Sequence, residues 1–344
     1  QQQKGDAIPN TCASIPRSDE LEQLVRKRGW PPRFRWRKPA AVSHGSDNQM
    51  RRPLFWAMAS GTRREREEAA GRSYLSLLSY QRPQASSTCM AEIERDLGRT
   101  LPGVKGPSGE NDYFSSPSGQ EKLRHVLGAF AAYNPTVGYC QSMNFVAALL
   151  ILQLHDEEVA FWVLATVVND VLPHYYHRSL YGLQIDQAVL AEYVQAELPK
   201  VHKHFQALSF DLAFVSTNWL LCAFINTLPW DCVERLFDLL LYGASADILL
   251  RASLALLLLL QPKVLACRTQ EELFQCMKPK GGVLTLEKGA AIQPGKLMQT
   301  IFTRLPPLHD LHDRRAKFLL LHRQKTRHSA RSELLNAGDL QSGI

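Results

Sequence analysis

The feature that most constrains this 344-residue chain is a pair of helical patterns separated by a short polar break. Before the break, Leu123, Val126 and Phe130 recur at the spacing of one helical face. Pro135 ends that pattern, because proline disfavours helical geometry in the residue before it. After the break, residues 145–154 are almost all apolar, which predicts a buried helix.

The rest of the chain repeats this kind of pattern. Apolar residues at helical spacing fill residues 159–172, 190–198, 212–228, 233–242 and 248–260. Antiparallel strands are indicated by runs of alternating apolar and polar residues joined by a hairpin turn, and we find no such runs. The fold class predicted from the pattern is therefore all-α.

The polar break reads Gly-Tyr-Cys-Gln-Ser-Met-Asn over residues 138–144. It lies just before the buried helix, so we expect Gln141 at or near a helix N-terminus, on a turn that presents it outward. A glutamine amide can both donate and accept hydrogen bonds. The free N–H groups and the dipole of a helix N-terminus favour an anion beside it.

A second informative stretch covers residues 89–101. Ile93 and Thr100 lie on one helical face, and Asp96 and Arg99 are three residues apart, so their side chains can pair. Pro102 ends the pattern, which predicts Arg99 in the last helical turn, beside a loop. An arginine held there by a carboxylate can reach away from the protein. From the spacing alone, the favoured explanation is a plain intrahelical ion pair, worth about 0.2–0.5 kcal/mol.

Composition sets broad limits on function. The chain is 45% hydrophobic and 21% charged, as in ordinary globular proteins. Its net charge of +7 is compatible with nucleic acid, acidic lipid or an acidic protein, and selects none of them. The seven cysteines are scattered, which argues against a disulfide framework and for a reducing compartment. No signal peptide is visible, and the longest apolar run, residues 252–260, is too short to span a bilayer.

Several common chemistries have no support in the sequence. No Gly-Lys-Ser/Thr occurs, so we do not expect the chain to hold nucleotide phosphates itself, and no G-x-S-x-G hydrolase motif occurs. His174 and His177, like His309 and His312, have metal-ligand spacing but lack further ligands, so no metal is expected. The basic clusters fall on separate elements without interleaved aromatic residues, and we expect no nucleic acid.

Taken together, the two stretches resemble the TBC-domain family of Rab GTPase-activating proteins. The arginine-finger motif of that family, I-x-x-D-x-x-R, matches at Ile93, Asp96 and Arg99, with Thr100 following. The glutamine-finger motif, Y-C-Q-G-M-N, matches at Tyr139, Cys140, Gln141, Ser142, Met143 and Asn144.

The departure is Ser142, which stands where the family usually has glycine and where another backbone could come close. An Arg and a Trp four residues apart near the start of the family's domain correspond to Arg52 and Trp56. The resemblance covers roughly residues 25–325, and residues 37–50 form an insertion in a segment that is usually short.

The resemblance implies a two-lobed, all-helical fold. We expect an N-terminal tail over residues 1–20, a lobe carrying both fingers over 21–205, a C-terminal helical lobe over 206–325 and a tail over 326–344. Arg99 and Gln141 would be supplied in trans to a partner's GTP. Asp96 would hold Arg99 ready, and Tyr139 and Asn144 would brace the turn that carries Gln141.

The implied partner is a GTP-bound Rab-family GTPase, in regulation of vesicle trafficking. The chain would need no cofactor of its own, because GTP and Mg²⁺ are bound by the partner, and it would be an activator rather than an enzyme. The implied location is cytoplasmic, with peripheral attachment to endomembranes through the partner. One alternative is a catalytically silent TBC module that binds a small GTPase as an effector or scaffold, and a more distant one is a basic nucleic-acid-binding helical protein.

Overall fold

A computed structural model provides the fold and describes residues 51–59, 73–84, 87–106, 109–243, 246–278, 283–286 and 289–324. The expected N-terminal tail, the insertion at 37–50 and the expected C-terminal tail at 326–344 lie outside the described residues. Within them, β structure is limited to isolated bridges, such as the one between Thr285 and Ala291, so the predicted all-α class is confirmed.

The helices of the N-terminal half include the two, α5 and α7, that border the segments carrying Arg99 and Gln141. They are α2 (Arg51–Ala59), α4 (Tyr74–Gln84), α5 (Ser87–Leu97), the short 3-10 turn η1 (Tyr113–Ser115), α6 (Pro117–Tyr133), α7 (Met143–Leu154), α8 (Glu157–Thr166) and the π-helical η2 (Val167–Val171).

The C-terminal half begins with two consecutive helices and ends in a further one at residues 311–324. Its elements are α9 (Tyr181–Glu197), α10 (Pro199–Ala207), α11 (Ala213–Leu221), α12 (Trp230–Gly243), α13 (Asp247–Ala266), α14 (Gln270–Met277), α15 (Pro294–Gln299) and η4 (Thr300–Arg304).

Local sequence explains where several helices begin. The Ser116 hydroxyl accepts the Gly119 N–H (3.2 Å) at the start of α6, with proline at the first helical position. Asp156 caps α8 by accepting the Val159 N–H at 2.9 Å. Each cap satisfies a backbone donor that the first helical turn leaves without a partner.

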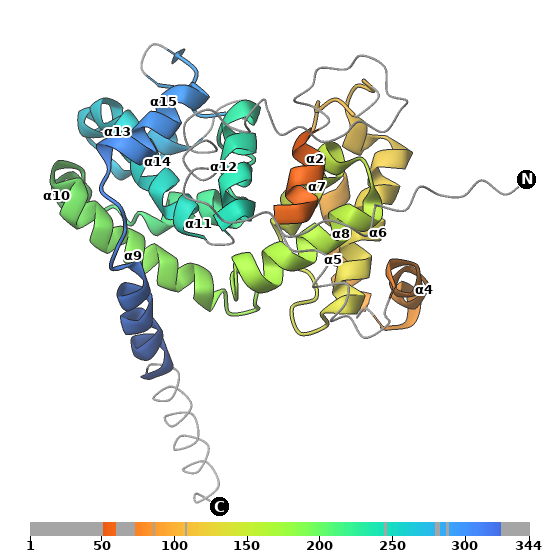
Figure 1. The fold of residues 1–344 in the computed structure, drawn as a ribbon. Coiled ribbons are helices and arrows are strands. Elements are labelled where there is room, and N and C mark those ends of the chain that lie inside the picture. Colours follow the sequence, from red (N-terminus) through yellow and green to blue (C-terminus); the bar gives the residue numbers. More distant parts are fainter. Residues whose placement is uncertain are drawn as a thin grey trace, which may run out of the picture.

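Two groups of helices form the two lobes, with α2 and α4–α8 on one side and α9–α15 on the other (Figure 1). Helix α12 packs against α2 and thereby joins the groups. The expected lobe boundary at residues 205–206 falls inside α10, and α9 and α10 both pack on α13. On these contacts we propose that the C-terminal lobe starts with α9.

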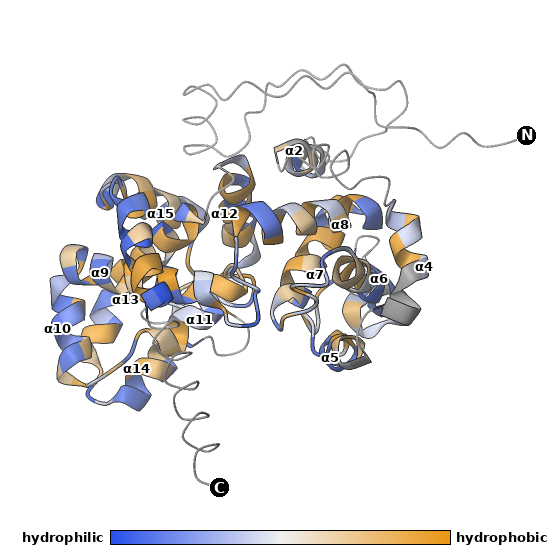
Figure 2. Ribbon diagram, turned by 90° about the horizontal axis from the view of Figure 1, so that it is seen from below, coloured by the Kyte–Doolittle hydropathy of each residue, from blue (hydrophilic) through white to orange (hydrophobic). Residues whose placement is uncertain are grey.

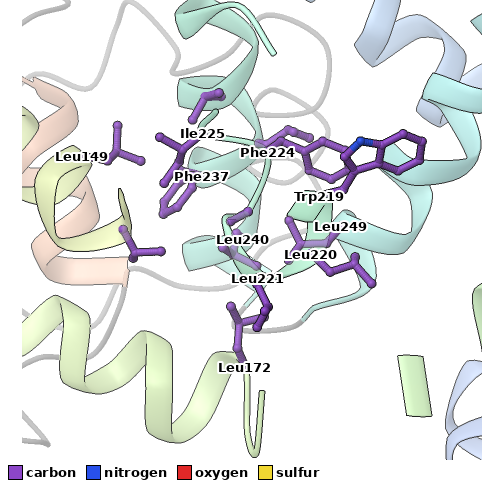
Figure 3. Packing of buried hydrophobic residues seen from close by; sticks show 14 of the residues in the cluster. Leu149, Leu172, Trp219, Leu220, Leu221, Phe224, Ile225, Phe237, Leu240 and Leu249 are labelled. Carbon is purple, nitrogen blue, oxygen red and sulfur yellow. The ribbon is translucent and has the colours of Figure 1, made fainter. Parts of the chain in front are cut away.

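A continuous apolar core runs through both groups of helices. Figure 3 shows part of it, with Phe237 and Leu240 of α12 lying between Leu149 of α7 and Trp219 of α11 in this view. In Figure 2 the most apolar helices, α7 and α13, lie inside the two groups. By length and composition alone α13 could cross a membrane, but most of its leucines are buried in this core.

Candidate functional site

Arg99 lies just beyond the end of α5. The helix ends at Leu97, four residues before Leu101, where the predicted helical stretch ends, so the expectation that Arg99 occupies the last helical turn was wrong. The Arg99 N–H donates to the Asp96 carbonyl at 3.3 Å, and the Thr100 N–H donates to the Leu97 carbonyl at 3.3 Å. These bonds span three residues, where α-helical bonds span four. They turn the chain out of the helix and leave the Arg99 side chain 56% exposed.

Gln141 lies two residues before the start of α7, and its side chain is exposed. The residue between them, Ser142, has a left-handed backbone conformation with φ 92° and ψ −22°. Its hydroxyl does not cap the helix. Its N–H instead donates to Asn144 Oδ1 at 3.2 Å, which holds the turn closed. The predicted position of Gln141 near a helix N-terminus is confirmed.

A chain of buried hydrogen bonds joins the arginine segment to the glutamine segment. Asp96 is buried, forms an ion pair with Arg99 and accepts the Tyr139 hydroxyl at 2.5 Å. The Thr100 hydroxyl donates to the Asp96 carbonyl at 2.6 Å and accepts from Asn144 Nδ2 at 2.8 Å. Two segments more than forty residues apart in the chain are thus held in one geometry.

The acid–base properties of this network keep its donors protonated. Burial, and then the hydrogen bond to Asp96, raise the pKa of the Tyr139 phenol well above its usual range, so it remains a donor. Burial, and then the charges of Glu92 and Asp96, raise the pKa of the Cys140 thiol to about 11. Cys140 is therefore an uncharged thiol at neutral pH, which does not suit a nucleophile.

An open pocket of about 300 Å³ lies where the two segments meet, and we call it the finger pocket. It is lined by Glu92, Arg95, Asp96, Arg99, Tyr139 and Gln141. An exposed guanidinium and an exposed amide on one rim can together contact an anion and a water molecule brought in by another molecule.

Two buried motif residues stabilise the segments that line the pocket. Ile93 is fully buried and anchors α5 in the core. Met143 is also buried, and its sulfur accepts the Cys140 N–H at 3.3 Å. These residues contribute packing and do not reach the pocket.

Comparison with known families shows which family the chain is similar to. The family model described as the Rab-GTPase-TBC domain matches residues 49–265, which is more than half of the chain and includes both pocket segments. The chain belongs to this family.

The TBC relatives share moderate identity with the chain. Growth hormone-regulated TBC protein 1-A of Danio rerio is 37% identical over 220 residues, which cover 63% of this chain and 58% of that protein. TBC1 domain family member 2A of Bos taurus is 33% identical over 269 residues, covering 77% of this chain and 26% of the relative. The chain therefore matches little more than half of the first relative and about a quarter of the second.

Solved TBC structures have the same fold. The TBC domain of the Chlamydomonas flagellar RabGAP superimposes with a TM-score of 0.65 at 28% identity, covering 84% of this chain and 86% of that one. The Ypt/Rab-GAP domain of Gyp1p gives a TM-score of 0.61 at 17% identity, covering 85% and 92%, and shows the fold alone.

Arg52 and Trp56, expected to support the site, do not line the finger pocket. Arg52 Nε donates to Asp238 at 3.0 Å and Nη1 to Glu234 at 2.6 Å, while Trp56 Nε1 donates to Asp238 at 2.8 Å. They tie α2 to α12 across the two lobes. Their contribution to the site is structural, through the placement of the lobes.

The finger pocket also contains two side chains that the motif search did not select. Glu92 and Arg95 project from α5 into the same pocket as Arg99. They precede Arg99 by seven and four residues, a spacing that places all three on one helical face. Helical periodicity counted back from Arg99 would have found them.

The histidines with metal-ligand spacing contact an aromatic ring or are exposed to solvent. His174 stacks on Tyr181 with ring centroids 4.5 Å apart, and His177 meets the same ring edge-on at 5.6 Å. Both His309 and His312 are exposed. Across the part of the chain that the structure describes, no group of three or more His, Cys, Asp or Glu side chains is arranged to hold a metal ion.

Proposed function

We propose that this chain is a GTPase-activating protein for a Rab-type GTPase and that it supplies Arg99 and Gln141 in trans. Domains of this family act on Rab GTPases, and the chain carries the family's fold. The observation that supports the finer proposal is the finger pocket, where an exposed arginine and an exposed glutamine from distant segments share one rim.

Arg99 would stabilise charge on the transferring phosphoryl group. Negative charge on its oxygens, and on the leaving-group oxygen, must be offset in the transition state, and an arginine finger does so at about 10³ to 10⁵ in kcat, or about 4 to 7 kcal/mol. The ion pair with buried Asp96 limits the side-chain rotamers of Arg99 before the partner arrives. Less conformational entropy is then lost when the guanidinium meets the phosphate.

Gln141 would orient the attacking water. Its amide carbonyl can accept a hydrogen bond from that water while its NH₂ donates one to a phosphate oxygen, which requires a fixed turn. The bond from the Ser142 N–H to Asn144 and the bond from Asn144 to Thr100 supply that rigidity. The partner brings the GTP and Mg²⁺, so the chain itself has no need of a cofactor. Regulation of vesicle traffic, on endomembranes reached through the partner, follows from this function.

Single-turnover GTP hydrolysis across a panel of purified Rab proteins tests the proposal. We expect the wild-type chain to accelerate at least one of them and Arg99→Ala to lose about 10³-fold or more of that acceleration with its fold intact. Gln141→Ala should also lower the rate strongly. A Rab whose own switch glutamine is replaced by leucine should still respond to the wild-type chain.

Two outcomes would contradict these roles. Equal stimulation by Arg99→Ala and wild type would remove Arg99 from the chemistry, and complete loss of response in the leucine-substituted Rab would remove Gln141. A chain that binds GTP-loaded Rab yet accelerates none would instead be the silent module. Ser142 is the residue that favours this second candidate, because it departs from the family's glycine at the turn.

A further inference from the structure

The finger pocket holds four charged side chains, and the family motif accounts for only Asp96 and Arg99. The other two, Glu92 and Arg95, come from the preceding turns of α5. Their side chains are 45% and 72% exposed, and the Arg95 guanidinium lies 4.0 Å from the Glu92 carboxylate. Arg95 Nε also donates to the Ala91 carbonyl at 3.2 Å, which keeps the guanidinium beside its own helix.

The charges in the pocket cancel only because Arg95 is present. Asp96 is buried and paired with Arg99, so these two charges offset each other. Glu92 would then leave a net negative charge in a pocket that has to receive phosphates. The charge of Glu92 also acts on neighbouring thiols, since after burial it is the next cause that raises the pKa of both Cys89 and Cys140.

We propose that Arg95 is a steering residue that offsets Glu92, so that the finger pocket can admit the phosphate-bearing surface of a nucleotide-bound GTPase. This inference rests on the proposed function. Arg95 acts on the approach of the partner rather than on the chemistry, since a rim charge that is largely exposed changes association rate and salt dependence. Arg99, paired with buried Asp96, retains the catalytic role.

A cycle of charge-removing substitutions tests the proposal, measured with a Rab that the wild-type chain has been shown to activate. Arg95→Ala should lower kcat/KM by about 3- to 10-fold at low salt and leave kcat at saturating Rab unchanged. Arg95→Lys should keep most of the activity. Glu92→Gln alone should raise kcat/KM, and the double variant Glu92→Gln/Arg95→Ala should return to within about 2-fold of wild type. The effect of Arg95→Ala should shrink as salt rises.

A matched control separates pocket charge from overall charge. Arg268 is exposed in the connection between α13 and α14, outside the finger pocket, and Arg268→Ala removes the same unit of charge. We expect no change in kcat/KM from this variant.

The inference would be overturned by equal losses from Arg268→Ala and Arg95→Ala, by a double variant as impaired as Arg95→Ala, or by a fall in kcat like that of Arg99→Ala. An active wild type with an unaffected Arg95→Ala refutes only this inference. A wild type that stimulates no Rab refutes the proposed function itself.

Discussion

Replacing Ser142 by glycine should stabilise the protein. Ser142 adopts φ 92°, a region in which a Cβ atom is strained and glycine is not. Its hydroxyl makes no capping bond to α7, so the substitution removes no helix cap. The Cys222 thiol lies within hydrogen-bonding reach of the Ser142 side chain, and that weak contact is the only loss we identify among the described residues.

The expected size of the gain follows from two opposing effects. A left-handed conformation costs a non-glycine residue about 1 to 2 kcal/mol, and the greater freedom of glycine in the unfolded chain cancels about 0.4 to 1 kcal/mol of the relief. The free energy of unfolding should therefore rise by about 0.8 kcal/mol, the middle of a range of about 0 to 1.6 kcal/mol, which corresponds to about 2 to 3 °C in Tm.

Urea unfolding followed by circular dichroism measures this change directly. Ser142→Ala is the matched control, because it removes the hydroxyl and keeps the backbone strain. We expect Ser142→Ala to be no more stable than wild type, so that the gain belongs to the backbone and not to the loss of the hydroxyl.

A loss of stability in Ser142→Gly, or an equal gain in Ser142→Ala, would refute the strain explanation. GTP hydrolysis by a responsive Rab supplies a second measurement on the same variants. We expect only a modest change in stimulated rate for Ser142→Gly, and a large increase would mean that the serine obstructs the partner.

Two further predictions concern the supports of the site. Asp238→Ala should lower the free energy of unfolding by about 3 kcal/mol in urea titrations, because it leaves Arg52 and Trp56 without their buried acceptor, while stimulated kcat stays unchanged. The pKa of Cys140 is raised to about 11, against 9.0 in the unfolded chain. The stability that this shift contributes is fully present below pH 9 and is lost as pH rises through about 11. Urea unfolding of wild type against Cys140→Ser across that range should show the excess loss in wild type.

Local features of the fold were predictable because their causes are local. The apolar spacing around Leu123 and the break at Pro135 predict the long α6, and the apolar run that follows predicts the buried α7. The end of α5 was less predictable, because the spacing of one helical face continues to Thr100. The helix itself ends at Leu97, where the backbone hydrogen bonds change. A pattern records which face is buried and not where the helical bonds stop.

Contacts between distant segments were not predictable from the pattern. Nothing in the sequence around Arg52 and Trp56 indicates Asp238, which lies more than 180 residues away on α12. The bond between Asn144 and Thr100 is of the same kind. Such pairs arise from the packing of whole helices, and helical periodicity carries no information about which helices meet.

The sequence by itself determined the all-helical class, the family and the two residues proposed for catalysis, because a short motif with a fixed spacing is a local property of the chain. Only the tertiary structure decided that Arg99 and Gln141 share one pocket and that Glu92 and Arg95 face it too. It also revealed the left-handed conformation of Ser142. These depend on how α5 and α7 pack and on where the backbone turns between them, and both are set by contacts across the whole molecule.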